Sequence, residues 1–265
     1  MSVVTFLTDY GLRDDFAGVC HGVIARIAPR ARILDITHGV ARHDVRSGAL
    51  ILRRAVPFMP AGVHLAVVDP QVGGRRRALA LRCAAQDRLL VGPDNGLLAP
   101  LAERLGGVLQ AVDIGRSPLR LEPLSASFHG RDVFAPVAAH LASGTPLADC
   151  GEPLDPAQLV ALELPQARVE QDSIVAHVLT VDHYGNVALD VEHDELAASG
   201  LRLGREVAVN GRPALHAATF SDVPAGGLVL YEDGYGVLSV AVNRGSALHA
   251  LGLELDAEVR IEPAP

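Results

Sequence analysis

The sequence predicts an α/β fold, with an N-terminal, mostly parallel sheet covered by helices on both faces and a small C-terminal β-barrel. In the first half of the chain, continuous apolar runs alternate with segments whose apolar residues recur at helical spacing, which indicates buried strands between helices. Beyond residue 171, turn residues punctuate short strand-like runs, as in small barrels. We therefore expect an α/β domain over 1–150 and a barrel domain over 172–265. Between them, 151–171 holds three prolines and no clear period, and is predicted to be a linker.

Short apolar runs rich in Val, Ile, Leu and Ala predict the strands of the first domain. These runs cover Ser2–Leu7, Arg32–Ile36, His64–Val68, Ala78–Cys83, Arg88–Val91 and Val108–Ile114.

Helical spacing predicts the intervening helices. Pro29 ends the first of them, and Asp44 is the expected N-cap of the second. The predicted helices cover Phe16–Ile27, Val45–Val56, Leu97–Leu105 and Asp132–Ala142.

In the second domain, β-rich runs lie between turn signals such as Tyr184-Gly185-Asn186, Asn210-Gly211 and Asp233-Gly234. The strands predicted there are Ile174–Val181, Val207–Val209, Leu228–Tyr231 and Gly236–Val242.

Composition excludes several classes of protein. The chain has 265 residues, is 49% hydrophobic and carries a net charge of −8, so neither nucleic acid nor an anionic membrane is expected as its main partner. Its three cysteines form no CxxC pair, which argues against a zinc knuckle or a disulfide framework. No apolar run reaches membrane-spanning length, and the N-terminus lacks the pattern of a signal peptide. We expect a cytoplasmic protein.

Three polar side chains stand at the edges of predicted elements and can act together on a water molecule. Asp69 follows an apolar strand, and one of the three arginines at 75–77 can reach back to it, which would keep the carboxylate ionised. His129 precedes a glycine and a predicted helix. Such a trio can hold and polarise water next to an electrophile. Taken singly, the arginine run also fits a solvated surface turn, and the histidine fits a helix cap.

Further candidates lie where strands end, the usual location of ligands in open α/β sheets. Asp9 is placed to accept hydrogen bonds from a ribose diol, and Asp182 with Asn186 can bind an amine and a ring nitrogen across a turn. The alternative for each is an ordinary turn residue. Asn95, between two glycines and a proline, is interpreted as structural.

The motifs FLTDYG, DITH, VVDP-x-VG-x-x-RR, GPDNG, FHGRDVFAP, VDHYGN and AVNRGSA occur in this order along the chain. This set resembles the S-adenosyl-L-methionine (SAM) hydroxide adenosyltransferase family, also called SAM hydrolases, which is related to the SAM-dependent fluorinase and chlorinase. The resemblance extends from Phe6 to about Ala247. It implies hydrolysis of SAM to adenosine and methionine, with SAM as the substrate and with no cofactor or metal. It also implies a homotrimer, in which the first domain of one subunit and the barrel of its neighbour form each active site.

The resemblance assigns a role to each candidate residue. The catalytic Asp, Arg and His correspond to Asp69, Arg76 and His129, with Arg76 chosen because it stands seven residues after the aspartate. The ribose-binding carboxylate corresponds to Asp9. In the second domain, the residues that bind the methionine amine and the adenine correspond to Asp182 and Asn186, and the backbone near Arg244 would also meet the adenine.

Departures from the halogenases indicate which nucleophile the site uses. Gly234-Tyr235 replaces the Ser-Arg pair that binds the methionine carboxylate there, so Tyr235 is a candidate contact without an assigned role. Phe16 replaces a side chain that contacts the amine. Asp69 replaces a tyrosine, and His129-Gly130 replaces a Tyr-Ser pair. A halide site needs neutral donors and an apolar wall, so an ionised Asp69 favours water.

Two versions of the chemistry stay open at this stage. In one, His129 accepts a proton from water that Asp69 and Arg76 orient. In the other, Arg76 and His129 bind hydroxide as an anion. Three other functions compete: a SAM-dependent halogenase, a non-catalytic adenosyl-binding protein, and a metal-dependent hydrolase. The last would use Asp9, Asp14, Asp15 and His38, which lack a second matching cluster.

Overall fold

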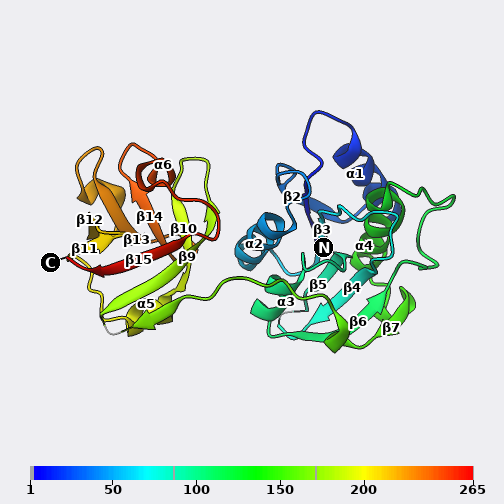
Figure 1. Ribbon diagram of the computed structural model, residues 1–265. Coiled ribbons are helices and arrows are strands. Elements are labelled where there is room, and N and C mark those ends of the chain that lie inside the picture. The colour runs from blue at the N-terminus through cyan, green and yellow to red at the C-terminus, as the bar shows by residue number, and fades with distance from the viewer. Residues whose placement is uncertain (1–2, 86, 171, 265) are drawn as a thin grey trace. The chain divides into compact units, whose positions relative to one another are not determined.

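The computed structural model describes residues 3–85, 87–170 and 172–264. The chain forms two compact units, Met1–Leu162 and Glu163–Pro265 (Figure 1).

The first unit is built on a mixed sheet. Within the described residues its strand order is β2 (Arg32–Thr37), β1 (Val3–Thr8), β3 (Val63–Val67), β5 (Leu89–Pro93), β4 (Ala78–Cys83), β6 (Val108–Asp113) and β7 (Glu152–Leu154). Strands β2, β1, β3 and β5 pair in parallel. The pairings of β4 with β5 and β6, and of β6 with β7, are antiparallel. The short connection between β4 and β5 allows only this direction, because a parallel neighbour requires a crossover.

Helices cover both faces of this sheet, as the sequence predicted. Helices α1 (Phe16–Ile27) and α4 (Ala135–Ala142) share one apolar core with Val4 and Phe6 of β1. Helices α2 (Val45–Ala55) and α3 (Ala99–Arg104) share the other core with Leu7 of β1 (Figure 1). Neighbouring residues of β1 thus enter opposite cores, which explains why a buried strand is apolar without interruption.

Local signals set several helix boundaries. The Asp44 carboxylate accepts a hydrogen bond from Ser47 N at 2.9 Å, so Asp44 is the N-cap of α2 as expected. The predicted helix over Asp132–Ala142 begins earlier than expected, with the π-helical turn η2 (Gly130–Phe134), followed by α4. Short turns of 3₁₀ helix complete the inventory: η1 (Val56–Phe58), η3 (Leu147–Asp149), η4 (Pro156–Gln158) and η5 (Phe220–Asp222).

The segment 151–171, predicted to be a linker, contains regular structure near both ends. Strand β7 pairs with β6 of the first unit, and β8 (Arg168–Glu170) pairs with β9 of the second. The boundary between the two units lies between residues 162 and 163. Edge strands of three residues carry too little apolar pattern to be recognised from sequence.

The second unit is a closed barrel. Its strands within the described residues are β9 (Ser173–Val181), β10 (Val187–Glu192), β11 (Glu206–Val209), β12 (Arg212–His216), β13 (Leu228–Glu232), β14 (Val237–Val242) and β15 (Glu258–Pro263). The order runs β10-β14-β13-β12-β11-β15-β9, and pairing of β9 with β10 closes the ring. Closure removes the exposed strand edges of an open sheet. Two short helices, α5 (His193–Ala198) and α6 (Ala247–Leu251), complete this unit.

Three barrel strands, β10, β12 and β15, were absent from the predicted set. Residues of β10 and β15 alternate between buried and more exposed positions. An alternating run of about six residues gives a weaker sequence signal than a continuous apolar run.

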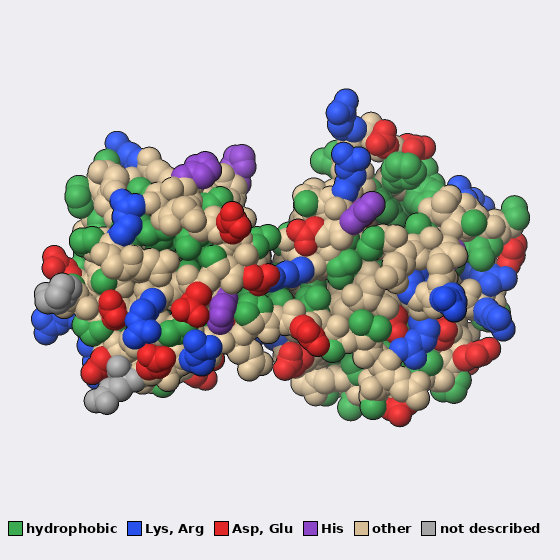
Figure 2. Space-filling model, viewed as in Figure 1, with side chains coloured by type: hydrophobic (Ala, Val, Ile, Leu, Met, Phe, Trp, Pro, Cys, Tyr) green, Lys and Arg blue, Asp and Glu red, His purple; other side chains and the backbone are tan. Residues whose placement is uncertain are grey.

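No helix in the described part of the chain is long and apolar enough to span a membrane. On the face drawn in Figure 2, basic and acidic side chains are interspersed.

The contact between β5 and β3 generates a test of the fold. A Cβ atom on Gly92 would lie 2.4 Å from the carbonyl oxygen of Ala66. We expect Gly92→Ala to lower the free energy of unfolding by about 1–3 kcal/mol, because backbone must shift to admit the methyl group. Gly18→Ala in α1 is the matched control, since its Cβ would meet nothing within 4 Å, and it should raise stability by up to about 1 kcal/mol. Urea denaturation measures both, and a wild-type value for Gly92→Ala would contradict the packing described.

Candidate active site

Arg76 and Asp69 form a nearly buried ion pair at the edge of the first sheet. Asp69 follows β3, and Arg76 precedes β4. Arg76 Nε donates to both carboxylate oxygens at 3.0 Å, and Nη2 donates to Oδ2. The two side chains are only 4% and 6% exposed. A bidentate, charge-assisted pair of this kind fixes the plane of both groups.

His129 joins this pair through the same guanidinium. Arg76 Nη2 lies 3.0 Å from His129 Nδ1. Arginine has donors only, so Nδ1 must be the acceptor and the neutral imidazole carries its hydrogen on Nε2. Burial lowers the pKa of His129, and the nearby positive charge of Arg76 lowers it further, against the opposing effects of Asp69 and Asp132. The favoured state is therefore a neutral imidazole that presents a donor at Nε2.

The three neighbouring arginines separate in the structure. Arg77 pairs with Asp94, Nε to Oδ2 at 2.7 Å, and Arg75 is exposed. Of the three arginines, only Arg76 forms a hydrogen bond to Asp69 within the part of the chain that the structure describes. Phe134 packs beneath it, with its ring centre 5.2 Å from the guanidinium carbon.

Close backbone contacts hold the loops that carry the trio. Gly73 has φ +76°, and a Cβ there would lie 2.3 Å from the Ala126 carbonyl oxygen. The loop before Arg76 therefore packs directly on the segment before His129. Asn95 donates to the Val68 carbonyl at 2.9 Å and so holds the residue before Asp69. This contact agrees with the structural role expected for Asn95.

Asp132, in the π-helical turn after His129, forms hydrogen bonds that hold the segment before His129 in place. It is 1% exposed, and its carboxylate accepts hydrogen bonds from Ser125 N at 2.8 Å and from Arg131 Nε at 2.6 Å. π-Helical turns of this kind are often found at functional sites.

A cavity of about 350 Å³ opens beside the trio, and Asp9, Asp69 and His129 line it. Asp9 Oδ2 accepts a hydrogen bond from His43 N at 2.9 Å, which orients the carboxylate. Asp9, the candidate ribose ligand, thus shares one cavity with two members of the trio. Arg76 contacts both Asp69 and His129 but is not part of the lining.

Aromatic side chains form another wall of this cavity. Tyr10, Phe16 and Phe128 line it, and their ring centres lie 5.2–6.1 Å apart in tilted or edge-to-face contacts. Burial raises the pKa of Tyr10 well above its ordinary value. A Cβ on Gly130 would lie 2.0 Å from the Tyr10 hydroxyl, so any larger residue there would displace the Tyr10 ring. Tyr10 and Phe128 were not among the residues predicted to form the site. Their position next to Asp9 and His129 was the available signal.

In the second unit, the structure brings Asp182 and Asn186 together in one turn. Asp182 Oδ1 accepts from the backbone N of Tyr184 and Asn186, and Oδ2 accepts from Asn186 Nδ2 at 2.8 Å. The turn itself therefore engages both carboxylate oxygens of Asp182, which fits the structural alternative. A Cβ on Gly185 would lie 2.2 Å from Ser246 Oγ, so the turn packs on the loop that contains Arg244.

The other two candidates of this unit lie on exposed turns. Arg244 is exposed and has φ +58°, a left-handed backbone conformation. Tyr235 is 44% exposed, and its backbone N donates to Asp233 Oδ1 at 2.8 Å. Burial, with Asp233 and Asp182 adding to it, raises the pKa of Tyr231 to about 12.

The alternative metal site of Asp9, Asp14, Asp15 and His38 does not assemble. Among the described residues, the group of ligand atoms close enough to hold one ion is His21, Asp35 and His38. Of the four residues first considered, only His38 belongs to it.

Both halves of the chain match known family models. Residues 4–151 match the SAM hydroxide adenosyltransferase N-terminal domain, and residues 176–260 match the C-terminal domain.

Known proteins of similar sequence or structure include one relative named (R)-S-adenosyl-L-methionine hydrolase, from Salinispora arenicola (strain CNS-205). It is 51% identical, over 97% of each chain. The crystal structure of an uncharacterised conserved protein from Thermotoga maritima superposes with a TM-score of 0.92 at 37% identity, covering 98% of this chain and 99% of that one. A fluorinase from Nocardia brasiliensis (strain ATCC 700358 / HUJEG-1) is 26% identical over 98% of this chain and 96% of its own. The similarity to the fluorinase is therefore the more distant.

The hydrogen bond from Arg76 generates a prediction for His129. In an NMR titration of the histidine rings, we expect the His129 pKa to lie below the ordinary value of about 6.5, with the hydrogen of the neutral ring on Nε2. His193 is the internal control, because its hydrogen bond to Glu232 raises its pKa. Since folding lowers the His129 pKa, its contribution to stability is fully present above about pH 6.5. That contribution is lost as the pH falls through the lowered value. A His129 pKa above that of His193 would contradict the geometry.

Proposed function

We propose, because this chain belongs to the SAM hydroxide adenosyltransferase family, that it hydrolyses S-adenosyl-L-methionine to adenosine and methionine. The observation that carries the proposal is the convergence of Asp69, Arg76 and His129 beside the cavity that Asp9 also lines. Such an arrangement can bind one water or hydroxide next to a bound nucleoside.

In the proposed reaction, the oxygen of water attacks C5′ of the ribose. The bond between C5′ and sulfur breaks, sulfur keeps the electron pair and becomes the thioether of methionine, and one proton is released. The sulfonium is already a good leaving group, so no acid is needed at sulfur. Alignment of the nucleophile behind C5′ can supply roughly 7–11 kcal/mol of barrier reduction.

His129 acts in this proposal as a hydrogen-bond donor to the nucleophile. Arg76 engages Nδ1, and Nε2 keeps its hydrogen at neutral pH because the pKa of the ring is lowered. Nε2 could accept a proton only in the other tautomer, which carries its hydrogen on Nδ1. A hydrogen on Nδ1 would remove the hydrogen bond from Arg76. Of the two versions left open by the sequence, the geometry supports hydroxide, or strongly polarised water, bound as an acceptor. Asp69 would accept the remaining hydrogen of that nucleophile.

The rest of the cavity suits the adenosyl sulfonium. Tyr10, Phe16 and Phe128 can face its positive charge, since aromatic faces attract cations. Asp9 can accept hydrogen bonds from the ribose diol. In this proposal, neither substrate binding nor the attack by water requires a cofactor or a metal ion, so we expect turnover to survive chelation.

We further propose that the barrel of a neighbouring subunit completes the site in a homotrimer. The lining of the cavity comes from residues 9–130. The candidates for adenine and methionine binding, which include Asn186 and Arg244, lie on turns of the other unit.

The three cysteines are buried free thiols, which supports a reducing compartment such as the cytoplasm.

A halogenase is the second candidate, because fluorinases are also related to this chain. The Asp69 carboxylate, which Arg76 holds in place, can accept a hydrogen from water or hydroxide, whereas a halide has none to offer and would meet the negative charge. We therefore favour water as the nucleophile.

Product analysis tests the reaction. The purified protein, incubated with each sulfonium epimer of SAM in EDTA, should release adenosine and methionine with and without excess chloride or fluoride. Asp69→Asn and His129→Ala should each lower kcat by about 10²–10⁴-fold, because both remove contacts to the nucleophile. Asp87→Asn, which removes the exposed partner of Arg82, should leave kcat unchanged. A 5′-halo product, or intact SAM after binding, would refute hydrolysis.

Mixing two inactive variants tests the shared site. Asp69→Asn alters the first unit and Asn186→Ala the second, and each alone should be nearly inactive. If the two units of a site come from different subunits, co-expressed trimers should regain about a quarter of wild-type activity by random assortment. Light scattering measures the oligomer. A monomer, or mixed trimers without recovered activity, would contradict the shared site.

A further inference from the structure

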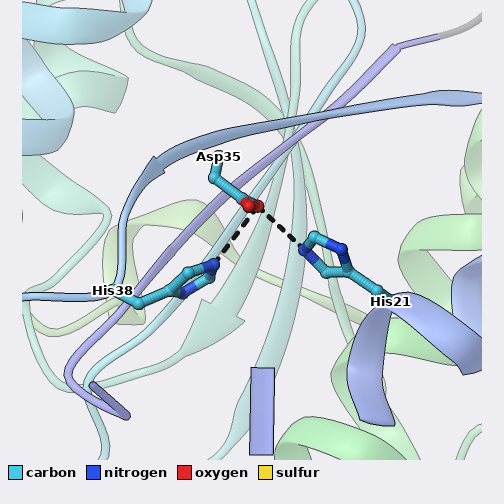
Figure 3. Close-up of side chains that lie close together, drawn as sticks. All are labelled: His21, Asp35 and His38. Atoms are coloured by element: carbon cyan, nitrogen blue, oxygen red, sulfur yellow. Dashed lines mark hydrogen bonds and ion pairs between the residues drawn. The ribbon is translucent and has the colours of Figure 1, made fainter. Parts of the chain in front are cut away.

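His21, Asp35 and His38 form a compact cluster outside the cavity. His21 lies on α1, Asp35 on β2, and His38 directly after β2. Figure 3 shows both rings turned toward the carboxylate between them. His21 Nε2 lies 2.8 Å, and His38 Nε2 3.2 Å, from the same oxygen, Asp35 Oδ1. None of the three residues lines the cavity beside Asp69 and His129.

The ring of His38 is prepared for a ligand at Nε2. It is 5% exposed, and Nε2 has no partner with hydrogen-bond geometry even though Asp35 is at ion-pair distance. A buried polar atom left in this state costs free energy. At the other side of the ring, Nδ1 lies 2.8 Å from Thr8 Oγ1. A metal-binding histidine commonly donates its second ring N–H in this way, which fixes the tautomer that leaves Nε2 free to coordinate.

We propose that this cluster binds one divalent transition-metal ion of the zinc type. Two imidazole nitrogens and one carboxylate oxygen suit such ions, whereas Mg²⁺ and Ca²⁺ prefer oxygen ligands alone. The three ligand atoms already lie within 4.8 Å of one another. Zinc–nitrogen bonds of about 2.0–2.1 Å require the side chains to rearrange around the ion, because the Asp35 oxygen now lies only 2.8 Å from His21 Nε2. His21 and Asp35, with side chains 34% and 42% exposed, have room to do so and leave a path from solvent. Water would fill the remaining coordination position.

The ion would act as a brace for the strand end that leads to the cavity. It would join α1 to β2 through His21 and Asp35. Through His38 it would also hold Thr8, whose Oγ1 accepts a hydrogen bond from Tyr10 N at 3.1 Å. The His38 carbonyl in turn accepts from Gly11 N at 2.7 Å. The site adds stability to the loop that carries Asp9 and Tyr10, and it takes no part in the reaction. The proposal is independent of the function proposed above.

Isothermal titration of the chelator-treated full-length protein with ZnCl₂ tests the site. We expect one equivalent to bind per chain, and Zn²⁺ but not Mg²⁺ to raise the melting temperature. Co²⁺ should give the visible absorption of a low-coordinate nitrogen and oxygen site. His21→Gln should weaken Zn²⁺ binding by at least about tenfold, since losses of outer contacts alone reach that size, and should abolish the thermal shift.

His193→Gln is the matched control. His193 pairs with Glu232, Nδ1 to Oε2 at 2.8 Å, but belongs to no three-ligand group among the described residues. Its removal should leave Zn²⁺ affinity unchanged. His21 lies on the helix surface, so circular dichroism should show an intact fold in His21→Gln. Absence of saturable binding in the wild type, equal affinity in His21→Gln, or an equal effect of Mg²⁺ would each overturn the proposal.

Discussion

The guanidinium of Arg76 is the group on which the candidate site depends. It holds Asp69 in a bidentate pair, donates to His129 Nδ1 and packs over Phe134. Because every one of its hydrogen bonds is a donor bond, it fixes the orientation of the carboxylate and the tautomer of the imidazole. An ordinary acidic residue and an ordinary histidine become a fixed acceptor and a fixed donor, which is the combination that a bound hydroxide requires.

Two close contacts hold the loops that carry Asp69, Arg76 and His129 next to one another. Gly73 lets the loop before Arg76 lie against Ala126, just ahead of His129. Asp132 then holds Ser125 from the other side, within a π-helical turn. The parallel part of the sheet places the ends of β1 and β3 at the same edge, so Asp9 and Asp69 share one cavity. A nearly buried ion pair and a half-buried histidine therefore lie together beside a cavity of about 350 Å³.

Continuous apolar patterns allowed most of the first unit to be predicted. The α/β class and the helices on both faces were confirmed, because strands buried on both faces differ clearly from amphipathic helices. The antiparallel direction of β4 was not predicted, although the short connection between β4 and β5 allows no other direction. Strands β7, β10, β12 and β15 were missed because they are short or alternate in burial.

The sequence by itself determined the types of residue at the strand ends, and through its ordered motifs it determined the family. Only the tertiary structure decided how those residues interact. It directs Arg76 to Asp69 and Arg77 to Asp94, because neighbouring side chains of an extended segment point in different directions. It also gathers His21, Asp35 and His38 from a helix and a strand. Their spacing follows no metal-binding motif, and only the packing of α1 beside β2 brings them within reach of one ion.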